Sequence, residues 1–180
     1  MKNRRYYYLA EGECEKKILD ALKQTPPLIH PGKTDTFNVI QDELKPRPLM
    51  NFAPGSCVVL VFDTDKDETE HLKKNIELLQ SLSFKVEILT IMQVLNFEDE
   101  IERATDVKSA LDLTKSASLK DFKNAVNRAK EKDFRSTLHR HKGNKETVIA
   151  DYLRNAGCIA TTSAGRNAID KYPLWSYYNK

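Results

Sequence analysis

The feature that most constrains the fold of this 180-residue chain is an unbroken apolar run at residues 57–62, Cys-Val-Val-Leu-Val-Phe. A strand that is buried on both faces needs such a run, as the inner strands of a parallel sheet do. The run ends abruptly in Asp63-Thr64-Asp65. The sequence therefore predicts a parallel sheet with two acids at the end of its most buried strand.

Strands and helices alternate along the first half of the chain. The predicted segments are a strand at 6–10, a helix over about 15–22, a loop at 30–35, a weaker strand at 36–40, the strand at 57–62, a helix over about 72–82 and a strand at 85–90. The helices show apolar residues at three- and four-residue spacing, and the strands are aromatic, β-branched or alternating. This order predicts an α/β fold with a mostly parallel, Rossmann-like sheet flanked by helices.

The rear of the chain follows a different pattern. Helices are expected at 97–103, near 119–129 and near 148–153, whereas residues 139–145 are expected to form a loop that leads into the last helix. We expect an α/β domain at 1–105 and a basic, mostly helical extension at 106–180 packed on it.

Charge divides along the chain more sharply than the net value of +3 suggests. Residues 1–114 hold 15 Lys and Arg against 20 Asp and Glu, whereas residues 115–145 hold 10 against 3. Such asymmetry is typical of a solvated helix face or of a surface for phosphates. The three cysteines include no CxxC pair, which argues against a disulfide scaffold and a Cys-based zinc site. With no apolar run near 18 residues and no signal-peptide core, we expect a soluble, cytoplasmic protein and no membrane partner.

Acids follow two of the predicted strands. Glu11, Glu13 and Glu15 come after the first, and Asp63 and Asp65 after the third. Ligands of open α/β sheets bind at the carboxyl ends of the strands, and clustered carboxylates favour a hard cation such as Mg²⁺. Acids in a first helical turn also interact favourably with the helix dipole, so we interpret Glu13 as structural. The Asp pair is the stronger functional candidate.

The residues at this point resemble a known family. A strand followed by Glu11-Gly12-Glu13-Cys14-Glu15, and later a strand followed by Asp63-Thr64-Asp65, is similar to the Toprim domain of topoisomerases, primases and OLD-type nucleases. The short form in RloB-like and OLD-like proteins of phage defence is the most similar. The segment Asn96-Phe97-Glu98-Asp99-Glu100 resembles a third acidic motif of that group. The resemblance covers about residues 5–103.

The resemblance implies Mg²⁺-dependent hydrolysis of phosphodiester bonds in DNA or RNA, with Mn²⁺ as a substitute, in prokaryotic defence against phages. It implies Glu11, Asp63 and Asp65 as catalytic metal ligands, with Glu15 and Glu98 as further ligands; the alternative role for Glu11 is proton transfer. OLD-type proteins join Toprim to an ATPase. This sequence has no GxxxxGK[ST] loop, so an ATPase would be a separate partner.

The basic segment supplies the cations that a nucleic acid requires. Its densest part, residues 139–145, holds Arg140, Lys142 and Lys145, which we assign to nucleic-acid binding; the alternative is a solvated helix face. Two other functions stay open. One is a Toprim-like module that binds nucleic acid or a protein without catalysis. The other is a phosphatase, because Asp63-Thr64-Asp65 also resembles the nucleophile motif of haloacid-dehalogenase-like enzymes.

Overall fold

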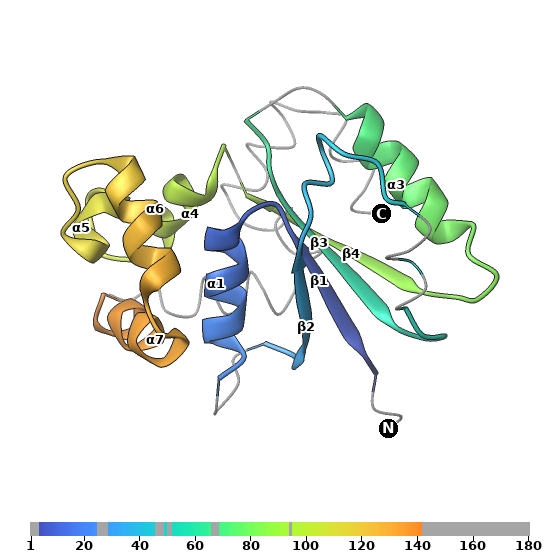
Figure 1. The fold of residues 1–180 in the computed structure, drawn as a ribbon, viewed down its shortest axis with the longest axis horizontal. Helices are drawn as coiled ribbons and strands as arrows, with labels where there is room; N and C mark the ends of the chain where they lie inside the picture. Colours follow the sequence, from blue (N-terminus) through green and yellow to red (C-terminus); the bar gives the residue numbers. More distant parts are fainter. Residues whose placement is uncertain are drawn as a thin grey trace.

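A four-stranded sheet forms the centre of the molecule in a computed structural model of the chain (Figure 1), which describes residues 4–24, 29–45, 49, 52–65, 69–93 and 95–141. The strands are β1 (Tyr6–Ala10), β2 (Gly32–Thr36), β3 (Cys57–Asp63) and β4 (Glu87–Gln93). Their order is β2-β1-β3-β4, and every pair is parallel. The predicted α/β fold with a parallel sheet is confirmed.

Helices cover both sides of this sheet. Helix α1 (Glu13–Leu22) follows β1, and α3 (Glu70–Gln80) lies on the opposite side (Figure 1). Each presents the apolar stripe that its spacing predicts, with Leu19 and Leu79 fully buried. Helix α4 (Phe97–Ala104) follows β4 where a short acidic helix was expected. None of the helices among the described residues is long and apolar enough to cross a membrane.

Three more helices pack beyond α1, on the side away from the sheet (Figure 1): α5 (Ala110–Thr114), α6 (Leu119–Arg128) and α7 (Glu131–Arg140). Helix α6 was expected; it begins at Ser118, whose hydroxyl accepts a hydrogen bond from the Asp121 amide. Helix α7 corrects the loop expected from residue 139, because Phe134 and Leu138 place an apolar stripe on the core. The helix expected near 148–153 lies outside the described residues.

The second strand lies four residues earlier than the sequence indicated. Residues 36–40 were the expected strand, whereas β2 spans Gly32–Thr36. It is an edge strand on which only Thr34 is buried, so no apolar alternation marks it. The apolar residues Val39 and Ile40 are buried in the turn that follows.

The strand order creates a switch point at the centre of the sheet. From β1 the chain crosses to β2 on one side, and later places β3 on the other side of β1. In sheets of this order the crevice outside the carboxyl ends of the two central strands is the usual ligand site. In this sheet the corresponding position is at the ends of β1 and β3, next to Glu11 and Asp63.

Candidate functional site

Glu11 joins the ends of the two central strands. Its Oε2 accepts a hydrogen bond from the Asp63 backbone N–H at 2.9 Å, and its Oε1 accepts one from Asn38 Nδ2 at 2.8 Å. The Asn38 Oδ1 in turn accepts the backbone N–H groups of Ile40 and Gln41 at 3.0 Å. This turn fixes the side-chain amide of Asn38, which in turn orients the Glu11 carboxylate. The sequence alone did not indicate Asn38 as a site residue.

Glu15 is buried in the first turn of α1, 7% exposed. Burial raises the pKa of its carboxyl, and the negative charges of Glu11 and Glu98 raise that pKa further. Gly12 makes room for it, because a Cβ at this position would lie 2.8 Å from the Glu15 Oε2. A larger residue at position 12 would therefore push the end of the Glu15 side chain away from its present place.

Asp63 is the electrostatic centre of the site. Burial raises the pKa of its carboxyl to about 9, and the charges of Glu11, Glu15, Asp65 and Glu98 contribute to that rise. Among the described residues, its Oδ1 is a buried oxygen with no hydrogen-bond partner. The structure thus brings all five predicted acids near one another. It leaves one buried oxygen free to accept a proton or a cation.

The two aspartates of the second motif are held in place by the residue between them. Thr64 is fully buried, and both its N–H and its hydroxyl donate to the Gln93 carbonyl at 3.0 Å. Its Oγ1 also accepts the Leu95 N–H at 3.1 Å. These bonds join the ends of β3 and β4, so Asp63 is directed inward and Asp65 stays exposed at the rim.

Glu98 lies near the other acids and contacts Lys123, a residue of the basic segment. Its side chain is 14% exposed, and its Oε1 lies 3.2 Å from the Lys123 Nζ. The preceding residues explain the contact, because the rings of Phe97 and Phe122 pack with their centroids 6.4 Å apart and join α4 to α6. Two adjacent pairs, one apolar and one charged, therefore place Lys123 beside the acids.

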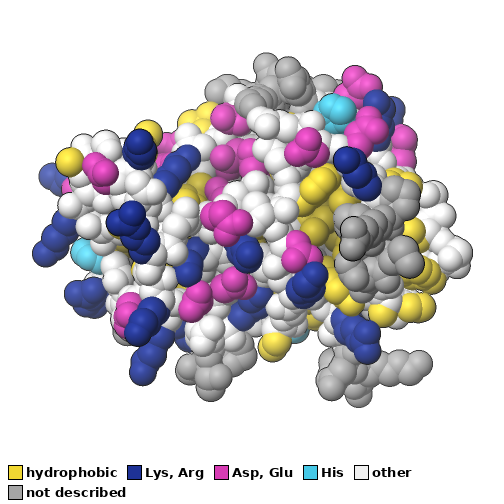
Figure 2. Space-filling model, in the orientation of Figure 1, with side chains coloured by type: hydrophobic (Ala, Val, Ile, Leu, Met, Phe, Trp, Pro, Cys, Tyr) yellow, Lys and Arg dark blue, Asp and Glu magenta, His cyan; other side chains and the backbone are white. Residues whose placement is uncertain are grey.

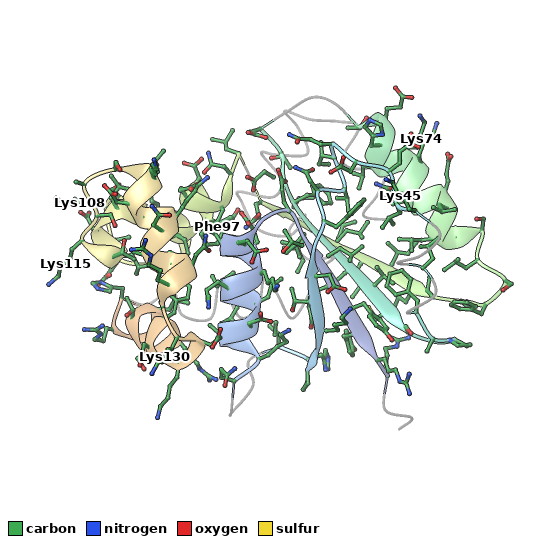
Figure 3. The ribbon with its side chains drawn as sticks, in the orientation of Figure 1. Lys45, Lys74, Phe97, Lys108, Lys115 and Lys130 are labelled. Atoms are coloured by element: carbon green, nitrogen blue, oxygen red, sulfur yellow. The ribbon has the colours of Figure 1, made fainter. Side chains whose placement is uncertain are left out.

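Of the three predicted nucleic-acid residues, the structure describes Arg140. Arg140 is the last residue of α7, where it donates to the Thr137 Oγ1 at 3.1 Å. Lys142 and Lys145 lie outside the described residues. Three other lysines of the helical part, Lys108, Lys115 and Lys130, point outward from it (Figure 3). Among the described residues, Lys123 contacts Glu98 of the acid cluster, and the charge count alone does not single it out.

The donor set at Asp63 fits a hard divalent cation. Within the part of the chain that the structure describes, no group of three or more acids, histidines or cysteines is placed so that it could hold a metal ion. Mg²⁺ does not require such a group, since it is usually held by one or two carboxylates and keeps several waters. A buried carboxyl oxygen without a partner, surrounded by like charges, offers such a ligand.

Cys14 lies beside these acids but is unsuited to be a nucleophile. Burial raises the pKa of its thiol to about 12, with the Glu15 charge as the next cause. Its Sγ donates to the Asn127 Oδ1 at 3.6 Å. Since the thiolate is the reactive form of cysteine, this thiol is inert at neutral pH.

The fold and the acids define an α/β protein with a cluster of carboxylates at the switch point of its sheet. No family model, curated protein or solved structure matches the chain. The function must therefore be argued from the residues themselves.

Proposed function

We propose that this chain is a Toprim-like, Mg²⁺-dependent nuclease that hydrolyses phosphodiester bonds of DNA or RNA, acts in prokaryotic defence against phages and has an ATPase as a separate partner. The observation that carries the proposal is the free, buried Asp63 Oδ1 in the field of four other carboxylates at the sheet's switch point. Such a cluster is unfavourable until a cation neutralises it. Perturbed acids at a ligand crevice are typical of active sites.

In this proposal Asp63 would bind the cation directly, and the negative charges of Glu11, Asp65, Glu15 and Glu98, which act on Asp63, would attract the ion to it. A bound Mg²⁺ supplies a Lewis acid for the phosphate and lowers the pKa of a water molecule. The protein supplies the orientation. Glu11 is fixed by Asn38 and by the Asp63 amide, so its position is set before any ligand arrives.

The helical part supports a polyanionic substrate. Lys and Arg gather over the α5–α7 part of the molecule, and acids lie between it and the sheet (Figure 2). Lys and Arg that neutralise phosphates provide most of the non-specific affinity for nucleic acid. Within the described part of the chain, Lys123 connects this surface to the acids through its contact with Glu98.

The proposal predicts metal-dependent cleavage by the wild-type chain. Plasmid DNA and a structured RNA should be cut with Mg²⁺ or Mn²⁺, and excess EDTA should stop the reaction because the carboxylates alone repel phosphate. Gel analysis of both substrates measures this. Salt-sensitive binding without cleavage would instead support the non-catalytic module. Turnover of p-nitrophenyl phosphate, with both nucleic acids left intact, would support the phosphatase.

Lys123 has a separate predicted effect. Replacing it with Met should slow cleavage by about 10- to 100-fold, because a charge-assisted hydrogen bond to phosphate contributes roughly 1.5–3 kcal/mol. The matched control is Lys108→Met, since Lys108 belongs to the same part of the molecule and points outward (Figure 3). Single-turnover rates check this. Equal rates for both variants would remove Lys123 from the site.

A further inference from the structure

The last residues of two neighbouring strands each carry a buried side-chain oxygen that has no hydrogen-bond partner. Gln93, the last residue of β4, is 4% exposed, and Asp63 is the last residue of β3. Among the described residues, neither the Gln93 Oε1 nor the Asp63 Oδ1 has a hydrogen-bond partner. A buried oxygen without a partner is unfavourable, and native structures usually keep one for a reason.

The sheet register places these two residues opposite each other. Asp63 pairs with Gln93 in the parallel ladder, so both side chains leave the same face of strands about 4.8 Å apart. The backbone there is fixed, because the Gln93 carbonyl already accepts two hydrogen bonds from Thr64. The amide side chain is therefore presented beside Asp63 by a rigid strand end.

We propose that Gln93 provides a neutral oxygen ligand for the divalent cation that Asp63 binds, an inference that rests on the proposed function. Amide oxygens are ordinary ligands of hard cations. A neutral ligand also suits this position, because a further carboxylate would add to a cluster in which five acids already repel one another. An amide adds an oxygen to the site without adding to that repulsion.

The test is calorimetric titration of the full chain with Mg²⁺ alone. Replacing Gln93 with Leu should weaken Mg²⁺ affinity by about 10-fold or more, since loss of a ligand or of its support typically costs 10- to 100-fold. Gln93→Glu keeps an oxygen in place and should bind Mg²⁺ more tightly than Gln93→Leu does. The control Gln80→Leu, at the exposed end of α3, should leave the affinity unchanged.

Urea unfolding without metal separates this role from a structural one. The Gln93 Oε1 makes no hydrogen bond here, so Gln93→Leu should unfold at the wild-type urea midpoint or above it. A clearly lower midpoint, or failure to fold, would show that the amide serves the fold and would overturn the proposal.

The controls also tell the two proposals apart. Wild-type Mg²⁺ affinity in Gln93→Leu, with binding lost in Asp63→Asn, would overturn the role of Gln93 alone. Absence of Mg²⁺ binding by the wild type would overturn the metal-dependent function, and this inference with it. Weakened binding in Gln93→Leu together with an unchanged urea midpoint is the result that we expect.

Discussion

Replacing Asp63 with Asn should reduce Mg²⁺-dependent cleavage by about three orders of magnitude or more. The substitution keeps the shape of the side chain and removes the carboxyl group that would give up its proton to bind the cation. A metal ion contributes several kcal/mol to stabilising the transition state, and each 1.36 kcal/mol is tenfold in rate. Single-turnover cleavage of the preferred nucleic acid measures the effect.

A matched control for this substitution is available in the same sheet. Asp35→Asn changes an exposed acid on β2 that pairs with Lys33 at 2.7 Å, and its rate should stay within about twofold of the wild type. Circular dichroism should show that both variants are folded. If Asp63→Asn cleaved as fast as Asp35→Asn, the acid cluster would not be the catalytic site.

The second large effect is on stability without metal. Folding raises the pKa of Asp63 to about 9, so between pH ~4 and 9 the folded state keeps a proton that the unfolded state has released. Stability then falls as pH rises through this window, and the favourable contribution is fully present only below pH ~4. Asp63→Asn removes the titration, so at pH 7 the variant should be more stable than the wild type by roughly 2–4 kcal/mol.

Urea unfolding across this pH range, with EDTA present, measures whether the free energy of unfolding falls as the pH rises. The wild-type free energy of unfolding should decline from pH 5 to pH 8 more steeply than that of the variant. Adding Mg²⁺ at about 100 times its dissociation constant should restore roughly 2.7 kcal/mol to the wild type at pH 7 and much less to the variant. Parallel pH profiles for the two proteins would contradict the burial of Asp63 in a field of like charges.

Much of the fold follows from local patterns in the sequence. The apolar run at β3 predicts its buried strand, and helices α1 and α3 follow their apolar spacing. Strand β2 could not be placed because its residues face solvent at the sheet edge. Helix α7 lacked a side-chain cap to mark its start. Elements without an apolar pattern or a cap leave little local signal.

The acids of the site could be named in advance, but their partners could not. Strand ends are visible in a sequence, so Glu11 and Asp63 stand out. Asn38, Gln93 and Lys123 come from three separate segments, and only tertiary packing brings them to the acids. The one local indication for Asn38 is its residue type, because Asn side chains often accept a hydrogen bond from the backbone two residues later, as Asn38 does from Ile40. Lys123 is one of ten basic residues in the segment 115–145, and nothing in the sequence distinguishes it from the other nine. The packing of Phe97 on Phe122 is what places it beside the acids.

A crystal structure of the protein soaked with Mn²⁺ would test the central claim most directly, because anomalous scattering locates the ion independently of any assay. We expect one strong peak at the ends of β1 and β3, within bonding distance of the Asp63 Oδ1. An Mn²⁺ ion bound elsewhere, or a fully soaked crystal with no peak beside Asp63, would contradict it.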